Sequence, residues 1–122
     1  MSDFPSANYA GIHLVVDFWG VLPDLLSEEQ LICQALMQAA KDAKINGLYS
    51  HFNHYENGPG IIGILVLDKG HVSIHTWPEI EYAAIDIFLC NISDPDEMLP
   101  ALIDFFKPEK VYINKLWRGI KK

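Results

Sequence analysis

The chain has 122 residues, half of them hydrophobic, and its 9 basic and 16 acidic side chains give a formal net charge of −7 with the histidines neutral. This composition predicts one packed globular domain, residues 1–122, and excludes a disordered or collagen-like chain. The negative charge disfavours nucleic acid as a partner, because its phosphates would be repelled, and favours small cationic ligands.

The first part of the chain predicts a strand and then a helix. Residues 11–19 are rich in β-branched and aromatic side chains and end at a turn that contains glycine and proline. Ser27-Glu28-Glu29-Gln30 is a capping-box pattern, and a stripe of apolar residues with helical spacing follows it. Asn46-Gly47 should close this helix.

The middle of the chain predicts four strands joined by short connections. Residues 48–55 and 61–67 are separated by a loop of glycine and proline, and the second of these segments has the continuous apolar character of a buried strand. Residues 68–70 suit a tight turn. Residues 71–77 and 82–90 follow, and both have the β-branched and aromatic content of sheet residues.

The last part predicts a second helix and a final strand. Ser93-Asp94-Pro95 is typical of a helix start, but Pro100 should distort that helix or delay its beginning to about Leu99. The helix should end near Phe106, and residues 111–117 should form the last strand. We therefore expect an α+β fold, a two-layer α/β sandwich in which a mainly antiparallel sheet carries two helices on one face.

Cysteine usage and the first residues bear on the compartment. Cys33 and Cys90 are too few for a disulfide framework, and neither lies in a C-x-x-C pair. Residues 1–10 lack the basic and apolar regions of a signal peptide, and the longest uncharged apolar run, residues 61–67, is too short to span a membrane. These features predict a cytoplasmic protein without a membrane partner.

Histidines are the most concentrated reactive side chains. Four of the five, His51, His54, His71 and His75, lie within 25 residues. On one strand His71 and His75 would be about 13 Å apart, too far to share one ion, so we expect no metal site. Cys90 could pair with His75 as a nucleophile or proton shuttle if the strands bring them together, but a lone cysteine is often only a small core residue.

Residues 71–90, HVSIHTWPEIEYAAIDIFLC, carry the most specific motif of the chain. This segment resembles the active-site signature of the prokaryotic S-adenosylmethionine decarboxylases. The opening Gly11-Ile12-His13-Leu14-Val15, together with His54 and Arg118-Gly119, also resembles that family. The resemblance covers almost the whole chain and implies the same α/β sandwich.

The resemblance implies an enzyme that makes its own cofactor. In this family a serine hydroxyl attacks the preceding carbonyl, the Glu-Ser bond is cleaved, and the serine becomes a pyruvoyl group that serves as the electron sink for decarboxylation. His75 matches the histidine that assists this processing. Cys90 matches the cysteine that protonates the product, and Glu79 the carboxylate that holds the substrate ribose.

The motif departs from the family at the bond that is cleaved. Lys69-Gly70 stands before His71, where the family has Glu-Ser. Glycine has no hydroxyl, so a pyruvoyl group cannot arise there and no cofactor is expected, although Asp-Lys-Gly would also suit a plain hairpin turn. Ile62 replaces a serine that assists processing, and Glu56 lies near the position of the aromatic residue that stacks on adenine.

We therefore expect an unprocessed homologue in spermidine and polyamine metabolism that binds S-adenosylmethionine or a related cationic nucleoside, as a regulatory or inactive protein. Glu79, His54 and Trp77 would bind the ligand. Trp77, Phe52 and Tyr55 could supply cation–π or stacking contacts, although core packing also explains such aromatics.

Two alternatives remain from the sequence: an enzyme whose pocket performs other acid–base chemistry on S-adenosylmethionine, such as a lyase-type elimination, and a structural partner of an active decarboxylase. The family's dimers imply a homodimer, or a hetero-oligomer with an active paralogue.

Overall fold

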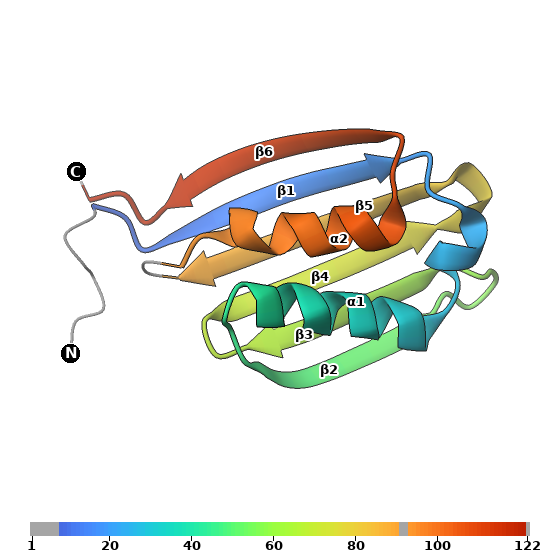
Figure 1. Ribbon diagram of the computed structural model, residues 1–122, viewed down its shortest axis with the longest axis horizontal. Helices are drawn as coiled ribbons and strands as arrows, with labels where there is room; N and C mark the ends of the chain where they lie inside the picture. The colour runs from blue at the N-terminus through green and yellow to red at the C-terminus, as the bar shows by residue number, and fades with distance from the viewer. Residues whose placement is uncertain (1–7, 91–92, 122) are drawn as a thin grey trace.

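The computed structural model describes residues 8–90 and 93–121 (Figure 1). One six-stranded sheet and two helices make up the fold. In chain order the elements are β1 (Gly11–Trp19), α1 (Glu29–Asp42), β2 (Gly47–His54), β3 (Ile61–Leu67), β4 (Gly70–Trp77), β5 (Tyr82–Cys90), α2 (Leu99–Phe106) and β6 (Lys110–Arg118). Short 3-10 turns lie at Pro23–Leu26, Pro78–Ile80 and Pro95–Met98.

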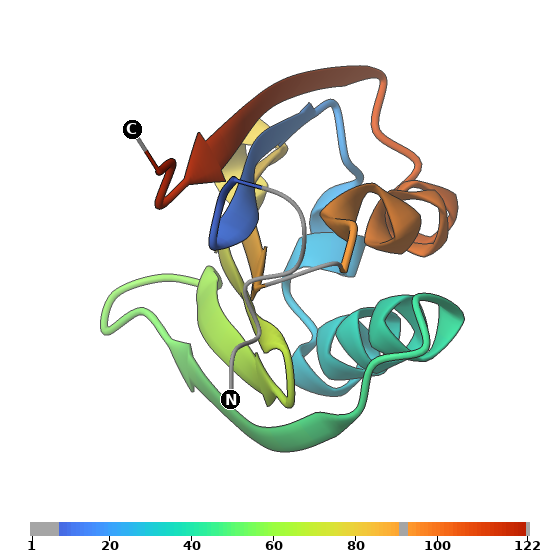
Figure 2. The same ribbon diagram turned by 90° about the vertical axis from the view of Figure 1, so that its left-hand side faces the viewer.

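The strands lie in the order β2-β3-β4-β5-β1-β6, and every neighbouring pair is antiparallel. Figure 2 shows both helices on one side of the sheet, while the other side carries none. This arrangement confirms the predicted two-layer α/β sandwich. We call the side without helices the open face.

Strand alternation places the core between the sheet and the helices. Aliphatic side chains at alternate positions of the central strands are fully buried, such as Leu14 in β1 and Ile74 in β4. The one buried polar residue among those described is Thr76. Its hydroxyl accepts a hydrogen bond from the Ile61 N–H and donates one to the Leu26 carbonyl, both 2.8 Å, so its polar atom is satisfied.

The predicted ends of the first helix were wrong. No side chain caps α1, because the Ser27 hydroxyl donates instead to the Pro23 carbonyl at 2.8 Å. At the other end α1 stops before the predicted glycine, because Lys44 adopts a left-handed backbone, φ 62°, and Ile45 donates its N–H back to the Ala40 carbonyl at 2.9 Å. Burial of Ile45 stabilises this earlier end.

The second helix begins where Pro100 allows. The carboxylate of Asp94 accepts a hydrogen bond from the Asp96 N–H at 3.0 Å, which caps the 3-10 turn before the helix. Helix α2 then starts at Leu99, so Pro100 lies in its first turn, where the missing N–H removes no helical hydrogen bond. The predicted delay of this helix is confirmed.

Candidate functional site

The open face carries most of the polar and aromatic side chains that the sequence singled out. Along β4 the residues that face the core are buried, and those between them point to the open face. The open-face residues of the four strands β4, β5, β1 and β6 include His71, Ser73, His75, Trp77, Tyr82, Ala84, Asp86, Phe88, Cys90, His13, Val15, Asp17, Trp19, Tyr112, Asn114 and Leu116.

A set of stacked rings, which we call the aromatic cluster, occupies one end of this face. The Trp19 and Tyr82 rings stack with centroids 4.4 Å apart, and the Tyr82 and Trp77 rings follow at 5.2 Å. Beyond Trp77 the His75 ring lies nearly parallel at 6.1 Å. The Tyr55 ring is also 6.1 Å from Trp77, and its hydroxyl is 3.4 Å from His75 Nδ1.

Burial and, after it, nearby carboxylates raise the pKa of both tyrosines of the cluster. The Tyr82 hydroxyl donates to Asp17 Oδ1 at 2.5 Å. Burial, this hydrogen bond and the nearby negative charges raise the pKa of Tyr82 to about 12. Burial and then the charge of Glu79 raise the pKa of Tyr55. At neutral pH the cluster therefore presents phenolic O–H donors beside the exposed carboxylate of Glu79.

The predicted former processing site lies at the opposite end of the sheet. The carbonyl of Lys69 accepts a hydrogen bond of 2.8 Å from the Cys90 N–H, so the start of β4 is joined to the end of β5. Gly70 has φ +154°, a backbone region that residues with side chains rarely adopt. A β-carbon built on Gly70 would overlap the carbonyl oxygen of Phe88 and lie 2.9 Å from its carbonyl carbon.

The two ends are far apart within one chain. His75 is opposite Ala84 in the sheet, and Ala84 precedes Cys90 by six residues on β5. This separation is about 20 Å at ~3.3 Å per residue. The pairing of Cys90 with His75 that the sequence left open therefore does not occur within one molecule. His75, Trp77 and Glu79 gather at one end, and Lys69, Gly70, His71 and Cys90 at the other.

Two residues predicted near the ligand lie on the helix side instead. His54 Nε2 is 3.2 Å from Glu29 Oε2 at the start of α1. Phe52 is opposite Gly63 and packs against the hydrophobic core. The side chains of His54 and Phe52 thus lie on the opposite face of the sheet from the aromatic cluster, because strand alternation directs them away from the open face.

Several open-face residues were missed in the sequence. Trp19 and Tyr82 belong to the cluster, Asp17 accepts the hydrogen bond of the Tyr82 hydroxyl, and Asp86 is hydrogen-bonded to His13 at 3.1 Å. The sequence does place these residues at alternate positions of two predicted strands, which indicates a common face on each strand. It does not show that the two strands are neighbours in the sheet. Within residues 8–90 and 93–121 no group of three or more His, Cys, Asp or Glu side chains could hold a metal ion.

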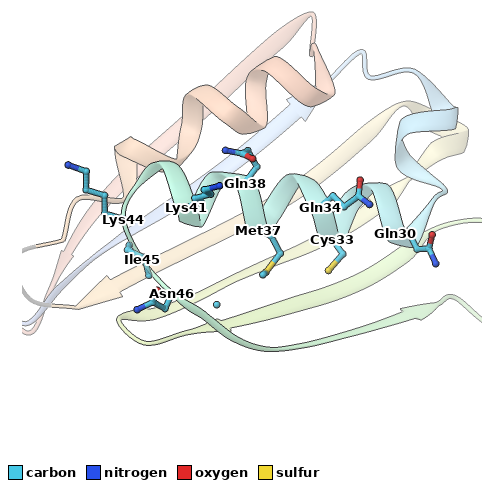
Figure 3. Close-up of a pocket in the computed structure, with 10 residues that line it drawn as sticks. Gln30, Cys33, Gln34, Met37, Gln38, Lys41, Lys44, Ile45 and Asn46 are labelled. Carbon is cyan, nitrogen blue, oxygen red and sulfur yellow. The ribbon is translucent and has the colours of Figure 1, made fainter.

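A large cavity lies away from the open face. It is a groove of about 1070 Å³ beside α1 and the segment that leads into β2. Figure 3 shows Cys33 and Met37 pointing from α1 toward β2, and Lys44 and Asn46 at one end of the groove. The groove contains neither the aromatic cluster nor the start of β4, so its size alone does not mark the functional site.

Comparison with known proteins identifies the family. Residues 12–119 match the family model described as S-adenosylmethionine decarboxylase. An S-adenosylmethionine decarboxylase proenzyme of Thermococcus onnurineus is 33% identical over 113 residues, which cover 92% of this chain and 79% of the relative. One of Methanococcus maripaludis is 35% identical over 111 residues, 90% of each chain. The chain belongs to the S-adenosylmethionine decarboxylase family.

A solved structure agrees with this family assignment. The crystal structure of the adenosylmethionine decarboxylase of Aquifex aeolicus superposes with a TM-score of 0.85 and 29% sequence identity, and the match covers 95% of this chain and 96% of that one. The resemblance of residues 71–90 to the prokaryotic signature is thus confirmed as family membership. Among the residues that the structure describes, no helix is both long and apolar enough to cross a membrane.

The pyruvoyl group of the S-adenosylmethionine decarboxylase family does not fit the residues present here. Gly70 has no side-chain oxygen that could attack the Lys69 carbonyl or leave in an elimination. The backbone adds a second obstacle, because even a β-carbon at this position would meet the main chain of Phe88.

Proposed function

We propose that this member of the S-adenosylmethionine decarboxylase family binds S-adenosylmethionine or a related cationic nucleoside without decarboxylating it, as an unprocessed regulatory or inactive protein of polyamine metabolism. The observation that carries the proposal is Gly70. Its missing hydroxyl leaves the Lys69 carbonyl without the nucleophile that the family uses, and its tight contact with Phe88 opposes any side chain there.

The aromatic cluster and Glu79 supply a binding surface for such a ligand. Indole and phenol faces attract a sulfonium or ammonium ion, and they stack on a purine. The carboxylate of Glu79 is exposed at the turn that follows β4 and would accept hydrogen bonds from ribose hydroxyls. The Tyr55 hydroxyl and the His75 ring lie in contact beside it and would donate or accept further hydrogen bonds.

A second copy of the chain would complete this surface. The open face leaves apolar side chains in contact with solvent, including Ile62 at 37% and Leu116 at 49% exposure. Two open faces packed with antiparallel strands would bring the His75 and Glu79 end of one protomer toward the Gly70 and Cys90 end of the other. We therefore propose a homodimer through the open face, and the same face would accept an active paralogue.

Calorimetric titration with S-adenosylmethionine tests the binding site. We expect binding by the wild-type chain and a loss of about 1–3 kcal/mol in Glu79→Gln, because a charged hydrogen-bond acceptor is removed. Glu97→Gln is the matched control, since Glu97 lies in the turn before α2 on the other layer. Absence of binding by the wild-type chain would contradict the proposal.

Mass spectrometry of the same samples separates the alternatives. Binding with unchanged ligand and an intact chain supports the proposed inactive homologue. Release of carbon dioxide, or a chain divided between Lys69 and Gly70, would refute it. A new product without carbon dioxide would instead establish acid–base chemistry in the pocket, and absence of both binding and turnover would leave a structural role.

Sedimentation equilibrium tests the dimer independently of the ligand. Ile62→Glu places a charge on the open face and should shift the protein toward monomer. Leu31→Glu is the control, because Leu31 is similarly exposed at 41% but lies on α1. A wild-type monomer, or equal effects of the two variants, would exclude the open face as the dimer interface.

A further inference from the structure

A second, smaller pocket of about 380 Å³ lies at the corner of the sheet where β1 ends and β6 begins. In Figure 1 this corner is at the right-hand end of the sheet, above the turn that joins β4 to β5. We call it the corner pocket. Its walls come from the end of β1, the turn before β5 and the start of β6, and of its lining residues Trp19 alone also belongs to the aromatic cluster.

Large apolar side chains line the corner pocket although they are exposed. Trp19 is 38%, Ile80 52% and Tyr112 54% exposed. One face of the Trp19 indole stacks on Tyr82, whose hydroxyl is held by Asp17, so the orientation of the indole is fixed. A rigid aromatic wall beside an open cavity suits a ligand with an apolar chain.

Two carboxylates and one ammonium group complete the lining. They belong to Glu81, Glu109 and Lys110. Within residues 8–90 and 93–121 neither carboxylate lies within 4.0 Å of a basic side chain. The pocket therefore holds one negative charge in excess beside two aromatic faces, and this combination attracts an organic ammonium ion.

Backbone hydrogen bonds hold the main chain at both glutamates in place. Glu81 has a left-handed backbone, φ 58°; its N–H donates to the Pro78 carbonyl, and its own carbonyl accepts from the Val21 N–H. The Glu109 N–H donates to the Trp19 carbonyl at 2.9 Å. Gly20 lets the Glu109 side chain pack directly against the β1 turn, because a β-carbon built there would lie 2.6 Å from Glu109 Oε1. A lining whose main chain is held in this way lowers the cost of ordering on binding.

We propose that the corner pocket binds a small molecule that carries a primary ammonium group on a short apolar chain. The ammonium group lies between Glu81 and Glu109, and the chain lies against Trp19 and Tyr112. The charge of Lys110 distinguishes two classes of ligand that carry such an ammonium group, simple alkylamines and amino acids. It repels a plain alkylamine, whereas it pairs with the carboxylate of an amino acid.

NMR titration tests the proposal with n-butylammonium and L-norleucine, which share the ammonium group and a butyl chain, and with butyrate as the anionic control. The indole N–H signal of Trp19, assigned with Trp19→Phe, should shift with a Kd of about 1–10 mM for ligands this small. Glu81→Gln and Glu109→Gln should each weaken binding about three- to fivefold, and Glu97→Gln should not change it.

Lys110→Met identifies the source. If amino acids are the natural ligands, this variant should bind norleucine more weakly than the wild type does, and n-butylammonium equally or more tightly. If the wild-type chain instead prefers n-butylammonium to norleucine, the natural ligands are simple amines. The proposal is overturned if neither ammonium compound shifts the Trp19 signal, if butyrate shifts it equally, or if both glutamine variants bind as the wild type does. These readouts do not depend on S-adenosylmethionine.

Discussion

Restoring the family's residues at the scissile bond should not restore processing. The double variant Lys69→Glu, Gly70→Ser gives the chain the missing hydroxyl, but the new β-carbon would overlap the Phe88 carbonyl and lie 3.1 Å from the Leu89 α-carbon. The serine also inherits the backbone of Gly70 at φ +154°. We therefore expect a destabilised chain that stays in one piece.

The size of this destabilisation can be estimated. A residue with a side chain in a sparsely populated backbone region costs about 1–3 kcal/mol, and overpacking against rigid main chain costs a further ~1–3 kcal/mol. The sum, about 2–6 kcal/mol, is a large part of the ~5–15 kcal/mol that stabilises a typical domain. At about 3–5 °C per kcal/mol for a domain of this size, Tm should fall by at least ~6 °C.

Thermal unfolding measures the expected loss of stability, and intact-mass measurement shows whether the chain stays uncleaved. Gly70→Ala should lower Tm about as much as Gly70→Ser, because both add the same β-carbon. Gly58→Ala is the matched control, since a β-carbon built there has no neighbour within 4 Å and Tm should stay nearly constant. Fragments of residues 1–69 and 70–122 from the double variant, or an unchanged Tm in Gly70→Ala, would show that β4 and β5 relax easily and that the steric argument is wrong.

Three further variants probe the fold around the site. Tyr82→Phe removes the hydrogen bond to Asp17 and should lower the free energy of urea unfolding by about 1 kcal/mol. The pKa of Tyr82 is about 12 in the folded protein against an ordinary value of 10.0, so this stability difference between wild type and variant should be complete below pH 10 and should decrease between pH 10 and 12. Thr76→Val leaves a buried N–H of β3 without a partner and should cost about 1–3 kcal/mol. Lys115→Met removes ion pairs of 2.7 and 3.5 Å but should cost no more than about 1 kcal/mol, and less at high salt; a larger, salt-independent loss would show that packing dominates. Hydrogen bonding to Asp96 raises the pKa of Lys115, so this small contribution should be present below pH 10.5 and disappear as the pH rises through the folded pKa.

The fold was predictable because alternation and turn chemistry are local. The strand over residues 61–67 and the delayed start of α2 follow from neighbouring residues alone, and both are confirmed. The ends of α1 were not predictable in the same way. The Ser27 hydroxyl donates its hydrogen bond to a carbonyl of the preceding 3-10 turn and so does not cap the helix. Burial of Ile45 stabilises a helix end that lies before Asn46-Gly47.

The sequence indicated residues of the candidate site but not their arrangement. The motif located His75, Glu79 and Cys90, yet spacing along the chain could not show that antiparallel register places Cys90 about 20 Å from His75. The same register brings Trp19 onto Tyr82 from a strand more than sixty residues earlier. Register depends on which strands pair, and a motif within two adjacent strands contains no information about a third.

Thr76 connects the fold to the proposed function. Its hydroxyl bridges the main chain of Ile61 and Leu26 inside the core, so this residue of β4 is held toward the helices. Since side chains alternate along a strand, His75 and Trp77 on either side of it must then face the open side. A shift of one residue would bury an imidazole and an indole and expose the threonine, at the cost of the satisfied core. Thr76, the polar residue of the motif that faces the core, therefore helps to direct His75 and Trp77 toward the proposed binding surface.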